Sequence, residues 1–170
     1  VLPDRLGDLT ALTWLDLSEN LIDELPRSLE NLTINETSFF RNKPQLDLFH
    51  KITLDEVLHR KHQRRDWNLK VWSAGCSTGQ EAYTMAMLIC DALAFYNLRN
   101  PLPIETPTPK PLVPPPWKVE LLASDLSYRV LRAAQEGSYS ESQMEPVDYS
   151  YRLRYFDKVG ERYAVKKTIK

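Results

Sequence analysis

Residues 71–88, VWSAGCSTGQEAYTMAML, contain the pattern that decides the fold. A short apolar run that starts at Leu69 enters the loop 75–79 (GCSTG), and a long segment with almost no charge follows. This order is typical of a strand, a tight loop and a buried helix. Glycine lets the backbone approach a ligand that a Cβ would repel, and the loop's N–H groups open onto a helix N-terminus. The stretch therefore predicts an α/β fold that cradles a nucleotide-like cofactor.

The glycine spacing separates this loop from the dinucleotide-binding pattern G-x-G-x-x-G. Gly75 and Gly79 are four positions apart and no third glycine follows, so a nicotinamide enzyme is a weak interpretation. A second apolar run, residues 119–124 (VELLAS), ends at Asp125. In doubly wound sheets an acidic residue at this place holds ribose hydroxyls, although an ordinary strand-end turn also favours Asp. The two runs predict parallel strands of a doubly wound sheet.

Five blocks of the sequence together resemble one protein family. They are NETSFFR (35–41), SAGCSTGQE (73–81), ASDLS (123–127), AAQEGSY (133–139) and RYF (154–156). In this order they resemble the CheR-type chemotaxis receptor methyltransferases, over about residues 35–165. The resemblance implies a Rossmann-like class I methyltransferase domain at 35–170. It further implies a cytoplasmic signalling enzyme that moves a methyl group from S-adenosylmethionine to glutamate side chains of a chemoreceptor-like protein.

The same resemblance implies roles for residues at matching positions. It implies a catalytic role for Arg41, whose guanidinium is suited to orient a substrate carboxylate, or polar parts of the cofactor, by forked hydrogen bonds. Helix capping is the alternative for Asn35 and Thr37. Gln80 stands where the family usually has an acid, and Ala82 where it usually has proline. The residues implied to bind the cofactor are Asn35, Thr37, Arg41, Gly75, Gly79, Glu81 and Asp125.

Methyl transfer to a carboxylate depends on alignment more than on proton transfer. A glutamate is already ionised at neutral pH, and the departing thioether is neutral. The enzyme must hold the oxygen, the methyl carbon and the sulfur in line, which is positioning work. We therefore expect no catalytic triad.

Composition bounds the remaining classes of function. The chain has 170 residues, 42% of them hydrophobic, and a formal net charge of -1. It has no run of 18 apolar residues, so we expect a soluble protein without direct membrane insertion. Cys76 and Cys90 form no C-x-x-C pair, which favours neither zinc nor disulfides and fits a reducing cytoplasm. The histidines lack a neighbouring set of metal ligands, and the basic run 59–65 lacks the interleaved aromatic residues that favour nucleic acid.

Residues 1–34 carry a different pattern, in which one set of leucines and prolines repeats. Leu2-Pro3, Leu6 and Leu9 recur 23 positions later as Leu25-Pro26, Leu29 and Leu32. This spacing is typical of a leucine-rich repeat. A solenoid needs about three repeats for stability, so we expect the end of a longer array, with a short adaptor as the alternative. A protein partner of these repeats is expected, but the sequence does not identify it.

Two further segments have clear patterns. Residues 45–63 have an apolar stripe at helical spacing followed by a basic run, which predicts a helix packed on the sheet. Residues 100–117 hold eight prolines, which cannot continue a helix or join the interior of a sheet. We expect an extended surface insert there, between the buried helix and the second strand.

Chain length limits the expected activity. A doubly wound sheet of seven strands needs about 200 residues at roughly 30 per strand–helix unit, more than this chain offers after the repeat. We therefore expect a chain truncated at both ends, whose methyltransferase domain is begun and not finished, and we expect no turnover by these 170 residues alone. The alternative function is a non-catalytic leucine-rich-repeat scaffold that carries a degenerate methyltransferase remnant.

Overall fold

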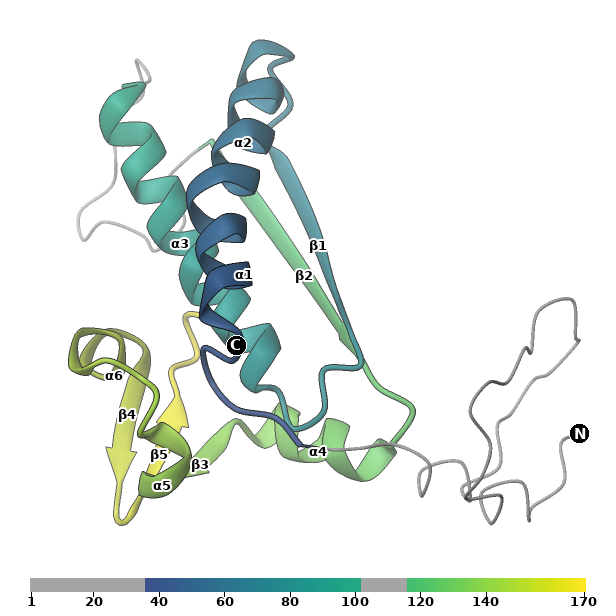
Figure 1. Cartoon of the computed structure of the whole chain (residues 1–170), viewed down its shortest axis with the longest axis vertical. Coiled ribbons are helices and arrows are strands. Elements are labelled where there is room, and N and C mark those ends of the chain that lie inside the picture. Colours follow the sequence, from purple (N-terminus) through teal and green to yellow (C-terminus); the bar gives the residue numbers. More distant parts are fainter. Residues whose placement is uncertain (1–35, 102–115) are drawn as a thin grey trace, which may run out of the picture.

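The computed structural model describes residues 36–101 and 116–170 (Figure 1). The expected repeat at 1–34, Asn35 and most of the expected insert at 100–117 lie outside the described residues. The helical elements are α1 (Lys43–Leu48), the π-helix η3 (Phe49–Thr53), α2 (Leu54–Gln63), α3 (Gln80–Arg99), α4 (Tyr128–Glu136), α5 (Glu141–Met144) and α6 (Tyr149–Tyr155). The strands are β1 (Asn68–Ala74), β2 (Lys118–Ser124), β3 (Ser138–Ser140), β4 (Phe156–Val159) and β5 (Arg162–Val165).

β1 and β2 form the parallel pair that the sequence predicts. Their pairing runs from Asn68 opposite Lys118 to Ala74 opposite Ser124. Parallel strands need a crossover connection, and α3 lies within the one that joins them (Figure 1). Successive side chains of a strand point to opposite faces, and in β1 Ser73 is buried while its neighbour Trp72 is 64% exposed. The α/β class with a parallel sheet is therefore confirmed for this part of the chain.

The helix expected over 45–63 is confirmed as a continuous helical path from Lys43 to Gln63. Pro44 lies in its first turn, where a missing N–H costs no hydrogen bond. The middle turn, η3, is a π-helix, a local widening that is frequent at functional sites. Leu54 and Leu58 of α2 are buried in one core cluster with Leu69 of β1 and Leu93 of α3, so this helix packs against the unit formed by β1 and α3.

A second, antiparallel sheet has the strand order β3-β5-β4. The sequence pattern did not predict it, because its strands have only three or four residues and show no readable periodicity. α5 begins beside it with a complete capping box, in which Ser140 accepts from the main chain of Gln143 and the Gln143 side chain accepts from the main chain of Ser140. That reciprocal pair satisfies two N–H groups that a helix start leaves unpaired.

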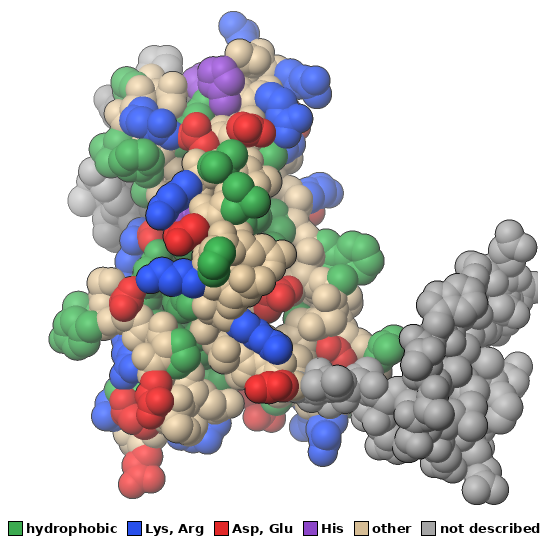
Figure 2. Space-filling model, viewed as in Figure 1, with side chains coloured by type: hydrophobic (Ala, Val, Ile, Leu, Met, Phe, Trp, Pro, Cys, Tyr) green, Lys and Arg blue, Asp and Glu red, His purple; other side chains and the backbone are tan. Residues whose placement is uncertain are grey.

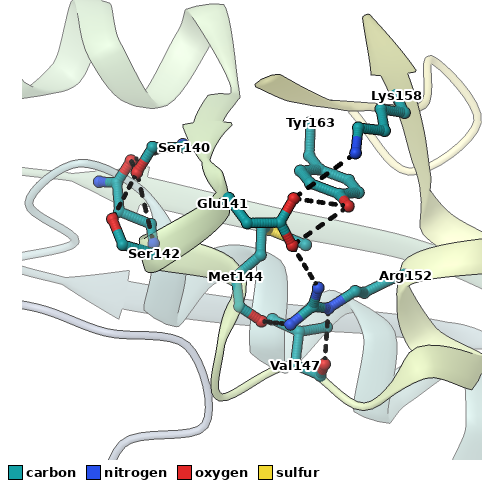
Figure 3. Close-up of polar contacts among 9 residues, drawn as sticks. Ser140, Glu141, Ser142, Met144, Val147, Arg152, Lys158 and Tyr163 are labelled. Carbon is teal, nitrogen blue, oxygen red and sulfur yellow. Dashed lines mark hydrogen bonds and ion pairs between the residues drawn. The ribbon is translucent and has the colours of Figure 1, made fainter. Parts of the chain in front are cut away.

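A charged network joins this sheet to its helices (Figure 3). Glu141 accepts hydrogen bonds from Tyr163 Oη at 3.0 Å and from Arg152 at 2.9 Å, and Lys158 Nζ lies 3.6 Å away. Arg152 also donates to the main-chain oxygen of Met144, the last residue of α5, and to that of Val147, between α5 and α6. The hydrogen bond from Tyr163 and the charges of Lys158 and Arg152 lower the pKa of Glu141. The network links α5, α6, β4 and β5.

α3 contributes to both hydrophobic clusters of the core. Met87 and Cys90 belong to the cluster that includes the second sheet, whereas Ile89 and Leu93 belong to the cluster around β1 and α2. Both cysteines are buried and free. Burial raises the pKa of the Cys90 thiol to about 11. A helix with apolar residues on both sides is typical of an interior position, and here α3 holds the two parts of the described chain together.

The surface mixes both signs of charge. Figure 2 shows basic and acidic side chains interspersed over the face in view. Among residues 36–101 and 116–170, no helix is both long and apolar enough to cross a membrane.

Candidate functional site

A cavity of about 810 Å³ lies where β1 and β2 end and α3 begins. Ligands of open α/β sheets bind outside the carboxyl ends of the strands, so this is the expected place for a site. Three separate segments supply its walls: the segment 36–49, the loop after β1 with the start of α3, and the end of β2. Five predicted site residues line it, namely Thr37, Arg41, Gly75, Glu81 and Asp125. Gly79 does not, and Asn35 lies outside the described residues.

The loop after β1 is held by the end of β2. The N–H groups of Gly75 and Cys76 donate to the main-chain oxygen of Ser124 at 2.8 and 2.9 Å. The φ angle of Gly75 is 76°, in the left-handed region that glycine adopts without a Cβ penalty. A Cβ built there would meet no atom within 4 Å. Because Gly75 lines the cavity, its missing side chain leaves open space against the main chain for a ligand.

Gly79 is a glycine for a different reason. A Cβ at this position would lie 2.9 Å from the Cβ of Ala134 and 3.0 Å from Tyr139 Oη. Tyr139 Oη in turn donates to the main-chain oxygen of Thr78 at 2.8 Å. Gly79 also lines a separate cavity of about 480 Å³. Its small size lets α4 and Tyr139 pack against the loop, and its binding of the cofactor stays a prediction.

Asp125 is fixed at the end of β2 by two main-chain donors. Ser77 N–H donates to Oδ2 at 2.8 Å, and Ser127 N–H donates to Oδ1 at 2.9 Å. The second bond is the strand-end turn considered as the alternative for this residue. The first bond fixes the loop at Ser77, whose φ of 48° is unusual for a residue other than glycine. Asp125 therefore makes the turn and lines the cavity.

Glu81 lies in the first turn of α3, where a negative charge interacts favourably with the helix dipole. The buried hydroxyl of Ser73 on β1 donates to Glu81 Oε1 at 2.7 Å. Its neighbour Gln80, which departs from the family pattern, is only 2% exposed, and its Oε1 accepts from Thr78 Oγ1 at 2.7 Å. The neutral amide is thus buried at the start of α3 against the loop, while the acid lines the cavity.

Arg41 brings a positive charge to the cavity. Its Nη1 donates to the main-chain oxygen of Glu36 at 2.6 Å. Among the ion pairs within the described residues, none involves Arg41. Thr37 precedes the first described helix, α1, whose N-cap is Asn42. Thr37 therefore caps no helix among the described residues, and the capping alternative for this residue was wrong.

The backbone is left-handed on both sides of Arg41. Phe40 and Asn42 have φ angles of 52° and 56°, a region in which a bulky residue such as Phe is an outlier and which Asn adopts more readily. The conformation of Phe40 costs about 1–3 kcal/mol and persists where the surroundings fix it. Phe39 supplies part of that fixation, because its ring is 1% exposed and lies 4.8 Å from the ring of Tyr139. Strained residues cluster at functional sites, which agrees with the position of Arg41.

Several lining residues were missed by the sequence analysis. Trp72 and Ser124 lie near the ends of the two strands, and Trp72 Nε1 donates to Ser124 Oγ at 2.9 Å. Their place near the carboxyl ends of the two predicted strands was the signal that could have identified them, because ligands bind at those ends. Gln45, Leu46 and Phe49 line the cavity as well. Leu46 and Phe49 are three positions apart and belong to the apolar stripe that the sequence showed. The remaining lining residues are Glu36, Ser38, Phe40, Ser77, Thr84, Met85 and Leu126.

Comparison with known protein families matches residues 35–99 and 113–170 to "CheR methyltransferase, SAM binding domain". The chain belongs to this family. It is 26% identical over 148 residues to "Chemotaxis protein methyltransferase" of Borreliella burgdorferi, covering 86% of this chain and 46% of that protein. It is 33% identical to "Chemotaxis protein methyltransferase 1" of Pseudomonas aeruginosa, covering 84% and 46%. The chain thus spans about half the length of these curated relatives.

The family assignment makes S-adenosylmethionine the cofactor of this domain, and the cavity residues fit it. A cavity of about 810 Å³ is within the usual range for small-molecule sites, roughly 300–1,000 Å³. The open space at Gly75 admits a ligand against the main chain. Glu81 and Asp125 offer carboxylates for hydroxyl or cationic groups, and Arg41 offers a guanidinium for a carboxylate.

Proposed function

We propose that this chain is the cofactor-binding part of an enzyme that methylates glutamate side chains of a chemoreceptor-like protein. The observation that carries the proposal is the cavity itself, which gathers Thr37, Arg41, Gly75, Glu81 and Asp125 from three separate segments. The relatives are named chemotaxis protein methyltransferases, which supports methyl transfer in chemotaxis; the glutamate acceptor follows from the sequence resemblance.

S-adenosylmethionine would supply a methyl group carried on a positively charged sulfur, and its transfer would form a carbon–oxygen bond to the substrate carboxylate and leave a neutral thioether. No proton has to move, because the carboxylate is ionised at neutral pH. The task of the protein is to hold the reacting atoms in line. The proposed roles follow this need. Asp125 would hold ribose hydroxyls, and Gly75 would leave room for the cofactor. Glu81 and Thr37 would hold its polar groups, and Arg41 would orient a carboxylate.

The N-terminal region adds a second part to the proposal. The leucine and proline pattern of residues 1–34 supports a leucine-rich repeat, followed from residue 35 by the methyltransferase domain. Such repeats present a surface for a protein partner. Two buried free thiols suit a cytoplasmic protein, where chemoreceptor methylation would take place.

The first test is calorimetric titration of the 170-residue chain with S-adenosylhomocysteine, beside Asp125→Ala. We expect the wild type to bind and the variant to lose at least about tenfold in affinity, because a carboxylate that accepts ligand hydrogen bonds contributes about 1.5–3 kcal/mol. Circular dichroism must show that the variant is folded, since Asp125 also fixes the loop. Binding that is equal in both proteins would remove Asp125 from the site. A folded wild type that does not bind would show that these residues alone do not form a cofactor site.

A further inference from the structure

One buried hydroxyl in the cavity wall has no role in the proposal so far. Thr84 of α3 is 1% exposed. Its Oγ1 donates to the main-chain oxygen of Gln80 at 2.7 Å. Thr84 Oγ1 also accepts a hydrogen bond from the N–H of Phe40 at 3.3 Å. The hydroxyl therefore links α3 to the strained segment that carries Arg41, although the two residues are 44 positions apart in the sequence.

The hydrogen bond between Phe40 N–H and Thr84 holds the main chain where it turns through left-handed residues next to Arg41. Phe40 and Asn42 are in the left-handed region, and Arg41 lies between them. The ring of Phe39 is buried in the core, and the ring of Phe40 lies 5.1 Å from that of Tyr151. These contacts hold side chains, whereas the bond to Thr84 holds the main chain next to Arg41. A rotation at Phe40 would move the guanidinium relative to Gly75 and Asp125.

The chemistry of this position requires a hydroxyl. A hydroxyl group can donate one hydrogen bond and accept another at the same time, and the oxygen of Thr84 does both. Serine keeps that ability. Valine has nearly the same shape as threonine but neither donates nor accepts, so it would leave the N–H of Phe40 without this partner.

We propose that Thr84 is a positioning residue for Arg41: its hydroxyl fixes the main chain at Phe40 so that Arg41 and Thr37 face the cofactor cavity. The inference rests on the proposed function, because it takes Arg41 as part of the site. Thr84 acts through the main chain, and the chemistry belongs to the residues that it places.

The test compares Thr84→Val with Thr84→Ser, and uses Tyr96→Phe as the matched control. Tyr96 is also buried on α3, and its hydroxyl lies 3.0 Å from His62 Nδ1, in the core cluster that contains neither Phe39 nor Phe40. The first readout is amide hydrogen exchange over residues 36–42, which needs no ligand. We expect exchange about fivefold faster in Thr84→Val, as for the loss of one hydrogen bond, and wild-type exchange in Thr84→Ser and Tyr96→Phe.

The second readout is calorimetric binding of S-adenosylhomocysteine. Thr84→Val should weaken binding about fivefold, and Thr84→Ser should restore it. In an Arg41→Ala background Thr84→Val should have no further effect, because two residues that act through one contact are not additive. Unchanged exchange in Thr84→Val, or faster exchange with unchanged binding, would overturn the inference and leave the proposed function standing. A folded wild type that does not bind would overturn both for this chain.

Discussion

At the scale of single residues, Gly75 and Gly79 show how one loop uses glycine in two ways. Both have positive φ angles, 76° and 95°. A Cβ at Gly75 would enter open space, whereas a Cβ at Gly79 would lie 2.9 Å from Ala134. The first glycine therefore keeps space for a ligand, and the second allows α4 to pack closely.

Alanine at each position should separate these roles. We expect Gly79→Ala to lower the free energy of unfolding by about 2–4 kcal/mol, since backbone strain and overpacking add. Gly75→Ala should cost about 1–2 kcal/mol from backbone strain alone. It should nevertheless weaken the binding of S-adenosylhomocysteine about tenfold, or about 1.4 kcal/mol. Urea unfolding and calorimetry measure the two effects. Equal losses of stability in both variants would contradict this distinction.

The two cysteines should be unreactive in the folded protein. Cys76 is 0% exposed and Cys90 is 6% exposed. Burial raises the pKa of both thiols, that of Cys76 with help from the charge of Asp125 and that of Cys90 to about 11. Only about one Cys90 thiol in a thousand is ionised at pH 8 with such a pKa, and the thiolate is the nucleophile.

An aromatic disulfide reagent at pH 8 should therefore label neither cysteine of the native chain and both in denaturant. Cys76→Ser is the control that assigns any slow labelling to one site. Rapid native labelling of Cys76 would show that the glycine loop opens.

At the scale of secondary-structure elements, one carboxylate joins α3 to α6. Asp91 accepts hydrogen bonds from Tyr151 Oη at 2.6 Å, Tyr155 Oη at 3.1 Å and Arg154 at 2.5 Å. We expect Asp91→Ala to lower the free energy of unfolding by about 2–3 kcal/mol, because it leaves the hydroxyls of the buried Tyr155 and the half-buried Tyr151 without their acceptor. Denaturant unfolding measures this change.

The matched control is Asp157→Ala on β4. Asp157 is exposed, and its carboxylate lies 3.8 Å from Lys166 Nζ. An exposed pair of this kind contributes little, so the control should change stability by no more than about 0.5 kcal/mol. Equal effects of the two substitutions would show that Asp91 does not join the elements.

The elements differed in how far the sequence could predict them. The order of β1, the loop and α3 was predictable because the glycines separate a short apolar run from a long one, and Asp125 was predictable from its place after β2. The packing role of Gly79 was not, since Ala134 and Tyr139 are far away in the sequence and meet it only through the fold. Strand β3 has three residues and offered no pattern. The π-helical turn Phe49–Thr53 leaves no mark in the apolar spacing, which reads the same for an α-helix and a π-helix.

At the scale of the whole molecule, two carboxylates at opposite parts of the described chain couple folding to pH. Asp66 joins the end of α2 to the start of β1, because it accepts from Lys61 Nζ at 2.6 Å and from Asn68 N–H at 3.0 Å. These hydrogen bonds, that from Lys61 first, lower the pKa of Asp66 to about 2. Glu141, in the network of the second sheet, has a lowered pKa as well. Both carboxylates favour the folded state only while they are ionised.

Acid should therefore destabilise the protein in a defined range. A carboxyl whose pKa is lower in the folded state stabilises that state above its unfolded pKa, and this stabilisation is lost as the pH falls through the folded pKa. For Asp66 it is present above 3.8 and disappears as the pH falls through about 2. We expect Asp66→Asn to lower the midpoint of thermal unfolding at pH 6 and to match the wild type near pH 2. Circular dichroism between pH 2 and 6 measures both curves, with Asp157→Asn as the exposed control. A constant gap between Asp66→Asn and the wild type at every pH would mean that the charge of Asp66 does not stabilise the fold, and that the asparagine acts only through its shape.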